Sequence, residues 1–485
     1  MTPRRPLGLA ALTWTVFVAG AVHALAAAPP ADASPGEGPE VRPPARGAYA
    51  VVVSEATRAD AAWQAVCDAL VAKYDGRLVT WAKDVREGRE PLAGLRPNYA
   101  CFVTRPEECG GAFVVKTHRL TRRLDADPYT DCLWGIVTGY DAADALRIAQ
   151  LKEPLVLRKV LSGTSGGKVG PFDAGVVFNE GKAGKMRVKK KGGDWQDQDG
   201  PKDSTKAIVD FFNDEKPDCF ITSGHATEHD WQIGYSYKDG QLRCKDGQLF
   251  GLDTQKQKHA IRSPNPKVHL PVGNCLIGRV PGPDCMVTAL IHSAGVVQMF
   301  GYIVPTWYGK GGWGIQDLYL DQPGRFTLAE AFFANTQAML HAIRTRFPDV
   351  AAKDIRAYDL RRVARETGVT DRDALGLLWD RDTVAFYGDP ALDVRPERGD
   401  LAWTQRLTVT GRRHALALSC RRAGTWPKQP VLAFLPHRID AASVKITEGE
   451  DLHPVVTDDF LMVPLAGDFA AGDTVRVVFT AARAK

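Results

Sequence analysis

Residues 218–228 read DCFITSGHATE, and residues 267–276 read KVHLPVGNCL. Each stretch is a short apolar run that ends abruptly in small and polar residues. Such runs are typical of strands that are buried on both faces of a parallel sheet. Ligands of open α/β sheets bind beyond the carboxyl ends of the strands, so the residues that end these runs are the first candidates for a functional site. They are Gly224-His225 and Asn274-Cys275.

The surrounding sequence repeats the same alternation of strand and helix. Buried strands are expected over residues 48–54, 78–81, 99–104, 132–137, 174–178, 219–222, 268–272 and 296–302. Helical spacing of apolar residues is found over 58–74, 142–151, 204–213 and 328–347. This order predicts an α/β fold with an open, mostly parallel sheet and helices on both faces.

The pattern changes after Tyr387-Gly388-Asp389-Pro390. From Asp400 onward, apolar and polar residues alternate with period two in short runs at 405–409, 415–419, 431–435, 444–447, 460–463 and 475–480. Turn residues separate these runs. A small β-sandwich is the structure that this spacing predicts.

Composition limits the class of protein. The chain has 485 residues, 44% apolar and 25% charged, which predicts a folded chain of about three domains or sub-domains and excludes a disordered one. The net charge of +5 falls to +3 when Arg4 and Arg5 are removed with a signal peptide. We therefore expect no nucleic-acid partner.

The N-terminus has the form of a secretory signal peptide over residues 1–28. Arg4 and Arg5 precede an apolar run that is too short to span a bilayer, and small residues suited to cleavage follow near Ala26 and Ala28. We expect no membrane span and a secreted or periplasmic protein. Residues 29–46, rich in proline, alanine and glycine, predict a flexible linker.

Nine cysteines lie beyond the signal peptide. An odd number leaves at least one thiol without an intramolecular partner in an oxidising compartment. A thiol near an imidazole is favoured as thiolate, and the imidazole can protonate a leaving amine. Cys275 and His225 suit these roles if they project from adjacent strand tips, and the N–H groups of Gly224 and Cys275 would then hold an oxyanion. The alternatives are a buried or disulfide-bonded Cys275 and a loop histidine without function.

Several motifs resemble the gingipain family of cysteine peptidases. They are Ser223-Gly224-His225-Ala226-Thr227-Glu228 with Trp231, Asn274-Cys275, Thr306-Trp307 and Tyr387-Gly388-Asp389-Pro390-Ala391-Leu392. The resemblance extends over about residues 48–396. It implies a caspase-like fold with two α/β halves at 47–160 and 161–396, followed by an immunoglobulin-like β-sandwich at 397–485.

The resemblance also implies roles for single residues. Cys275 would be the nucleophile and His225 the catalytic histidine. Glu180, after the predicted strand 174–178, matches the glutamate that orients this histidine, although an ordinary loop acid is the alternative. Trp307 resembles the wall of the pocket for the side chain before the cut bond, with a structural tryptophan as the alternative. We also expect Glu228 to contact substrate.

The chain departs from the family pattern at two places. Ala226 stands where the family usually has glycine after the histidine. The loop after Glu180 is cationic, with Lys182, Lys185, Arg187 and residues 189–191, where arginine-specific members carry an acid. A cationic loop would repel a basic substrate side chain and favour an acidic or neutral one, although such charge runs are usually solvated loops.

Metal chemistry is the main rival. Residues 225–229 have the pattern H-x-x-E-H, formed by His225, Glu228 and His229. On a helix this pattern would suit a zinc peptidase. The apolar run before it instead predicts that His225 follows a strand. The glycine-rich run 162–168 lacks the spacing of a phosphate loop, and we interpret it as a flexible connection between the two α/β halves. No cofactor is expected to be required; surface carboxylates of an exported protein can hold a structural calcium ion, but no EF-hand loop is present.

The sequence thus predicts an exported cysteine-type endopeptidase that acts on peptides or proteins through a Cys/His dyad and an acyl-enzyme. The alternatives are the zinc peptidase and a non-catalytic secreted binding protein that keeps the peptidase fold.

Overall fold

The computed structural model describes residues 49–355 and 359–484. The predicted signal peptide and linker lie outside these residues. Within the described part of the chain, no helix has both the length and the apolarity that a membrane span requires.

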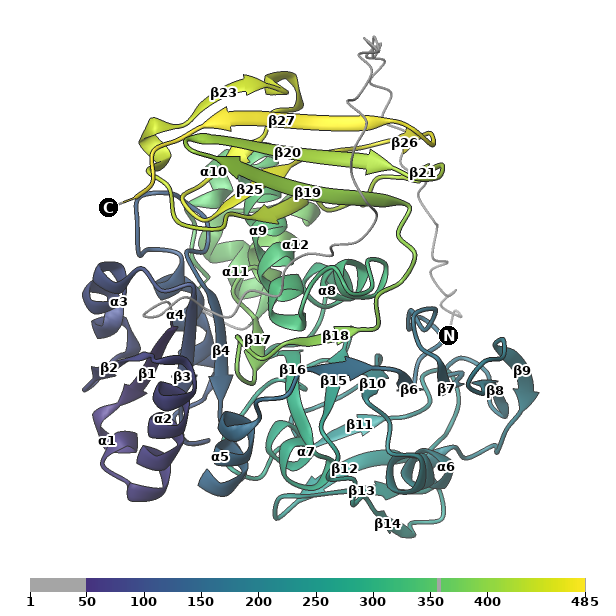
Figure 1. Cartoon of the computed structure of the whole chain (residues 1–485). Coiled ribbons are helices and arrows are strands. Elements are labelled where there is room, and N and C mark those ends of the chain that lie inside the picture. Colours follow the sequence, from purple (N-terminus) through teal and green to yellow (C-terminus); the bar gives the residue numbers. More distant parts are fainter. Residues whose placement is uncertain (1–48, 356–358, 485) are drawn as a thin grey trace. The chain divides into compact units, whose positions relative to one another are not determined.

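One large sheet organises the described structure (Figure 1). Its strand order is β2-β1-β3-β4-β17-β16-β15-β10-β6-β7-β8-β9. The bounds of these strands are β1 (Tyr49–Ser54), β2 (Arg77–Trp81), β3 (Tyr99–Val103), β4 (Leu133–Val137), β6 (Lys159–Ser162), β7 (Ala174–Phe178), β8 (Lys185–Lys189), β9 (Gln196–Asp199), β10 (Cys219–Thr222), β15 (Lys267–Pro271), β16 (Val296–Tyr302) and β17 (Val384–Tyr387).

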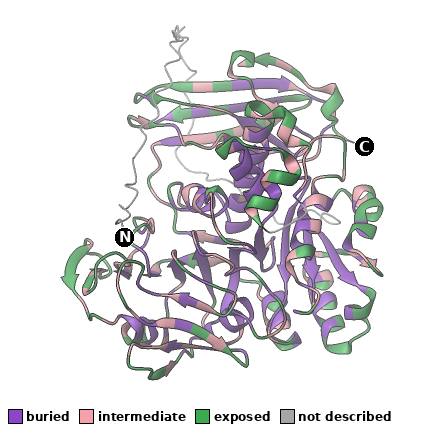
Figure 2. Cartoon of the chain, turned by 180° about the vertical axis from the view of Figure 1, so that it is seen from behind, coloured by how far each residue is buried: buried purple, intermediate pink, exposed green. Residues whose placement is uncertain are grey.

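The sheet is mostly parallel. The antiparallel pairs among its described strands are β16–β17, β7–β8 and β8–β9. Every residue of β1, β4 and β16 is buried, and Figure 2 shows buried residues along the strands in the interior. Because successive side chains point to opposite faces, burial of every residue means that both faces are covered. The prediction of a mixed α/β fold with a large, mostly parallel sheet is confirmed.

The helices follow the strands along the chain. Their bounds are α1 (Glu55–Arg58), α2 (Ala61–Tyr74), α3 (Arg89–Leu95), α4 (Gly111–Thr121), α5 (Ala142–Gln150), α6 (Thr205–Asp210), α7 (Met286–Ala294), α8 (Lys310–Leu320), α9 (Leu328–Arg346), α10 (Pro348–Ala351), α11 (Leu360–Thr367) and α12 (Arg372–Asp380). A single helix over 58–74 was expected, but Asp60 caps a new helix by accepting hydrogen bonds from the N–H groups of Ala62 and Trp63.

Smaller sheets flank the large one. They contain β5 (Leu155–Leu157) with β18 (Val394–Pro396), and the antiparallel set β11 (Asp230–Gln232), β12 (Gln241–Lys245), β13 (Gln248–Leu252) and β14 (Lys258–Ala260). The C-terminal region is antiparallel, with β19 (Trp403–Thr410), β20 (Arg413–Cys420), β21 (Gly424–Thr425), β22 (Val431–Phe434), β23 (Lys445–Glu448), β24 (Val455–Val456), β25 (Phe460–Val463), β26 (Asp468–Phe469) and β27 (Thr474–Thr480).

The segment after β17 holds the two halves of the large sheet together. The buried carboxylate of Asp389 accepts hydrogen bonds from the Tyr49 hydroxyl at 2.9 Å and the Tyr74 hydroxyl at 2.7 Å. Lys73 forms an ion pair with the same carboxylate at 2.9 Å. The Tyr387-Gly388-Asp389-Pro390 motif therefore has a structural role in this chain.

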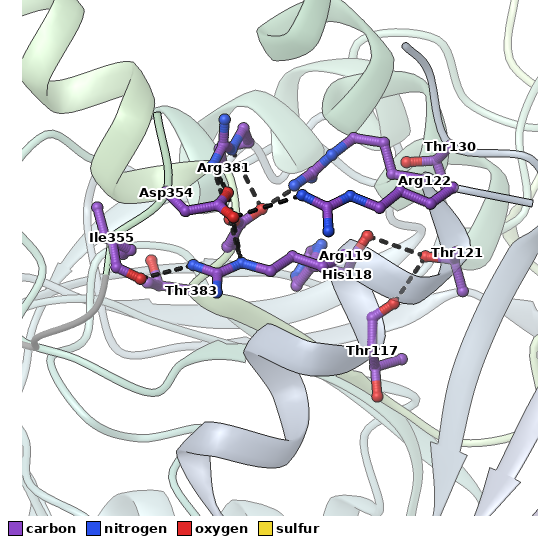
Figure 3. A network of polar contacts seen from close by, with 12 residues as sticks. Thr117, His118, Arg119, Thr121, Arg122, Thr130, Asp354, Ile355, Arg381 and Thr383 are labelled. Atoms are coloured by element: carbon purple, nitrogen blue, oxygen red, sulfur yellow. Dashed lines mark hydrogen bonds and ion pairs between the residues drawn. The ribbon is translucent and has the colours of Figure 1, made fainter. Parts of the chain in front are cut away.

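A buried charge network fixes α4 against the segment that precedes β17 (Figure 3). The fully buried Asp382 pairs with Arg122 at 2.8 Å and with Arg381 at 2.9 Å. Arg381 also reaches Asp354 at 3.1 Å. Burial lowers the pKa of the neighbouring His118 to about 4, so this histidine is neutral near pH 7.

The C-terminal strands pack against the α/β region through a few specific contacts. The Arg438 guanidinium donates to the carbonyl oxygens of Pro97 at 2.9 Å and Asp131 at 2.6 Å. The ring of Phe460 lies edge-on to Tyr129 and to Phe333 of α9.

One prediction about the connections is wrong. The glycine-rich run 162–168 does not connect the two halves, because it follows β6 and leads to β7, the neighbouring parallel strand. The misinterpretation arose because no helix follows this loop, so the usual strand-to-helix signal is absent.

Candidate active site

The strands β10 and β15 are direct neighbours and carry the two candidate residues at the same edge of the sheet. Thr222 pairs with Pro271 in parallel register, and the N–H of Val272 donates to the Thr222 carbonyl at 2.9 Å. His225 follows β10 by three positions, and Cys275 follows β15 by four. The two segments that follow β10 and β15 therefore start side by side at the same edge of the sheet.

Asn274 joins the two loops. Its side-chain oxygen accepts a hydrogen bond from the Thr222 hydroxyl at 2.7 Å, and its amide nitrogen donates to the Gly224 carbonyl at 3.2 Å. Asn274 precedes Cys275, and Gly224 precedes His225. The Asn274 side chain thus holds the loop that carries Cys275 against the loop that carries His225.

A buried histidine supports this connection from below. His269 Nε2 lies 2.9 Å from the Thr222 hydroxyl. Burial lowers the pKa of His269 to about 3, so the ring is neutral. The Thr222 hydroxyl donates its hydrogen to Asn274, so it can only accept from His269. We therefore infer that Nε2 of His269 carries a hydrogen and donates it to the Thr222 oxygen.

Cys275 sits in a tight turn beside the end of β16. Its half-buried Sγ accepts a hydrogen bond from the N–H of Thr306 at 3.2 Å. The next residue, Leu276, has φ of 57°, a left-handed conformation that costs a non-glycine residue about 1–2 kcal/mol. Strained backbone of this kind is common where a side chain must be presented for chemistry.

The remaining thiols are poor nucleophiles. All nine cysteines are free in the structure, and seven of them are buried. Burial raises the pKa of each of the other eight thiols, to about 12 for Cys67, Cys109 and Cys244. A thiol with such a pKa stays protonated at neutral pH. Cys275 is the thiol that follows β15 at the same edge of the sheet as His225.

The His225 side chain is exposed and stacks on Tyr235, with ring centroids 5.0 Å apart and an interplanar angle of 23°. Its carbonyl accepts a hydrogen bond from the N–H of Gln232 at 2.9 Å. In the described structure, no hydrogen bond joins the imidazole to Sγ of Cys275. Catalytic hydrogen bonds are often long without substrate and tighten when it binds.

Two backbone donors remain available beside these side chains. Among the described residues, the N–H groups of Gly224 and Cys275 donate to no protein acceptor. Gly224 has φ of 88°, which a residue with a side chain rarely adopts. These are the N–H groups that we expected to stabilise an oxyanion.

Glu180 contacts the neighbouring loop rather than His225. Its carboxylate accepts hydrogen bonds from the Thr164 hydroxyl at 2.7 Å and the Ser165 N–H at 2.6 Å. Its carbonyl accepts from the N–H of Tyr235 at 2.8 Å. Because Tyr235 stacks on His225, the backbone of Glu180 positions the ring that supports the imidazole.

Two tryptophans lie near this edge. The predicted pocket residue Trp307 is half-buried, with its ring 6.1 Å from Tyr308 and 5.9 Å from the Arg372 guanidinium. Trp313, which the sequence did not single out, packs against two glycines of the neighbouring loops. A Cβ added at Gly273 would be 3.2 Å from its Nε1, and one at Gly166 would be 2.9 Å from its Cη2.

The segment that contains His225, Glu228 and His229 is not helical. Ala226 and Trp231 form an antiparallel bridge, and the N–H of Thr227 donates to the Asp230 carbonyl at 2.8 Å. The helical spacing on which the zinc hypothesis depends is therefore not present. The carboxylate of Glu228 faces Arg279, with 3.6 Å between Oε1 and Nη1.

The cationic loop after Glu180 contains the hairpin β8–β9, and two of its six basic side chains are paired. Lys185 pairs with Asp199 at 2.5 Å, and Arg187 with Asp197 at 3.5 Å. All four side chains are exposed, so these pairs contribute little to stability. They do reduce the repulsion of basic substrates that we expected from this loop.

Asp125, Asp127 and Asp131 place ligand oxygens within 4.8 Å of one another in the loop before β4. Burial raises the pKa of Asp127 to about 6 and that of Asp131 to about 9. A structural calcium ion remains a prediction, and this loop belongs to the other half of the sheet from Cys275.

Comparisons with known proteins add a structural similarity. No protein-family model and no curated protein matches the sequence. Among solved structures, the chain is similar to one from the complex of Porphyromonas gingivalis RgpB pro- and mature domains. The identity is 10% and the TM-score 0.41, with 90% of this chain and 99% of that chain covered. We therefore base the functional conclusions on the geometry of this chain.

Proposed function

We propose that this protein is a cysteine-type endopeptidase with Cys275 as the nucleophile and His225 as the acid and base. The observation that carries the proposal is the hydrogen bond from Asn274 to the Gly224 carbonyl, which fixes the two loops side by side. The raised pKa of every other thiol and the motifs that resemble gingipains support the same assignment.

The residues would act in two steps. First, the Cys275 thiolate attacks the peptide carbonyl carbon, and the N–H groups of Gly224 and Cys275 stabilise the oxyanion. The C–N bond then breaks, protonated His225 transfers its proton to the leaving amine, and a thioester remains. In the second step His225 takes a proton from water, the hydroxide attacks the thioester, and the acid product leaves as the thiolate re-forms.

An inhibitor comparison tests this proposal against the zinc alternative. The native protein is incubated with a diverse library of fluorogenic peptides after treatment with iodoacetamide or with EDTA. We expect iodoacetamide to abolish cleavage and EDTA to leave it unchanged, because the nucleophile is a sulfur and not a metal-bound water. Cleavage that survives alkylation and is lost with the chelator contradicts the cysteine mechanism.

A non-catalytic binding protein is the second candidate. Its support is that, in the described structure, no hydrogen bond joins the His225 imidazole to Sγ of Cys275. A freshly reduced protein that cleaves no member of the library would favour this candidate.

Tyr235 offers a test of how His225 is positioned. Its side chain is 56% exposed, so truncation leaves no cavity in the core. A stacked aromatic pair contributes about 0.5–1.5 kcal/mol, and we expect Tyr235→Ala to lower kcat by about two- to tenfold with little change in KM. Tyr235→Phe keeps the ring and should restore kcat. An equal loss in both variants, or a change confined to KM, would exclude this positioning role.

We further propose the finer features of the fold and location. The α/β region would be caspase-like, the C-terminal strands would form an immunoglobulin-like sandwich, and the mature protein would be secreted or periplasmic. The antiparallel pairing of the strands after residue 400, which form three sheets, and the apolar N-terminal sequence support these assignments.

A further inference from the structure

A cavity of about 460 Å³ begins one residue away from Cys275. Leu276 and Arg279 line one side, residues 303–305 a second, and Gly111 and Ala112 at the start of α4 a third. A volume of this size is typical of small-ligand pockets. The cavity therefore has room for a substrate side chain.

The cavity is fixed to the candidate nucleophile by backbone hydrogen bonds. The N–H of Leu276 donates to the Val304 carbonyl at 3.1 Å, and the N–H of Thr306 donates to Sγ of Cys275 at 3.2 Å. The same two chain segments thus hold the sulfur and form two walls of the cavity. The residues that line the cavity are thus next to Cys275 and Thr306 in the chain.

The charge of the cavity favours an anion. Ile303 and Val304 are apolar and buried, and Arg279 is the charged residue among those that line the cavity. The Arg279 side chain is 47% exposed and forms an ion pair with Glu228 at 3.6 Å that engages Nη1, so its other guanidinium N–H groups remain unbonded in the described structure. Its N–H donors are therefore available to a carboxylate.

The start of α4 adds a weaker contribution of the same sign. The helix is capped by Gly110 without a side-chain hydrogen bond, and its first turn has no acidic residue. The positive end of the helix dipole therefore has no acidic residue in the first turn of the helix.

We propose that this cavity binds the acidic side chain of a substrate residue that flanks the scissile bond, with Arg279 as the residue that selects it. The proposal rests on the peptidase function proposed above. It differs from the selectivity expected from the loop after Glu180, because Arg279 lines a cavity that also contains Leu276, the residue after Cys275.

Matched peptides test the proposal. They are acetylated and amidated, which removes terminal charges, and they differ by Glu, Gln or Lys at each position around one cleavage site. We expect the native protein to prefer Glu over Gln by about tenfold or more in kcat/KM at one flanking position. Arg279→Gln should reduce this ratio to about one. Glu228→Gln should raise the ratio, because Glu228 competes with the substrate carboxylate for Arg279. The exposed Arg262→Gln is the matched control and should keep it.

A binding measurement separates this inference from the catalytic proposal. Peptide affinity is measured by fluorescence anisotropy with Cys275→Ala and with the double variant that also carries Arg279→Gln. Tighter binding of the Glu peptide that depends on Arg279 supports the acidic subsite even when the native protein cleaves nothing, a result that would overturn only the peptidase assignment. Cleavage or binding without a preference for Glu, or a preference that survives Arg279→Gln, overturns the subsite alone.

Discussion

Replacing Cys275 by alanine is expected to lower kcat/KM for peptide cleavage by at least about 10³-fold, the loss typical of removing a covalent nucleophile. No other described thiol can take over, because burial raises the pKa of each of them. The measurement is the initial rate on the peptide that the native protein cleaves best, followed for both proteins at equal concentration.

Cys244→Ala is the matched control for this experiment. Cys244 has the same intermediate burial as Cys275 but lies on β12, and burial raises its pKa to about 12. This variant should keep the native rate. Full activity of Cys275→Ala, or equal losses in the two variants, would contradict the assignment of the nucleophile.

The second large effect concerns stability. Replacing Asp382 by alanine is expected to lower the free energy of unfolding by about 3–5 kcal/mol, because it leaves the buried Arg122 and Arg381 without their shared partner. Denaturation in urea, followed by tryptophan fluorescence, measures the difference. Asp354→Ala is the control, since Asp354 is 30% exposed and its loss should cost no more than about 1 kcal/mol.

The difference between native and Asp382→Ala protein should also depend on pH. Burial by itself raises the pKa of the Asp382 carboxyl, but Arg122 and Arg381 outweigh burial and hold the pKa well below its ordinary value. A carboxyl whose pKa is lower in the folded than in the unfolded state stabilises the folded protein. This stabilisation is complete above the unfolded pKa of about 3.9 and is lost as the pH falls further. The difference in the free energy of unfolding between the native and Asp382→Ala proteins should therefore be constant from pH 7 to about pH 5 and decrease below about pH 4. A gap that grows on acidification would contradict the ion-pair explanation.

The sequence predicted the position of the candidate site because the relevant physics is local. An apolar run that ends in glycine and a polar residue marks the carboxyl end of a buried strand, and β10 and β15 are such strands. Because β10 and β15 pair in parallel, His225 and Cys275 lie at the same edge of the sheet.

The contacts that complete the site depend on pairs far apart in the chain and leave no local signal. The hydrogen bond from the N–H of Thr306 to Sγ of Cys275, 31 positions away, is an example. Glu180 shows the same limit: its place after β7 was predicted, but its carboxylate bonds to Thr164 and Ser165, in a loop that we had interpreted as a flexible connection. A pattern of residue types along the chain does not encode which loop lies against which.

The position of β17 in the sheet has a consequence for biosynthesis. This strand is formed by residues 384–387, yet it lies between β4, which ends at residue 137, and β16. The two halves of the sheet consequently have no shared strand until most of the chain has left the ribosome. Pairings between distant segments form slowly, so the nascent protein exposes two unpaired sheet edges, which are sites for aggregation, until β17 is made.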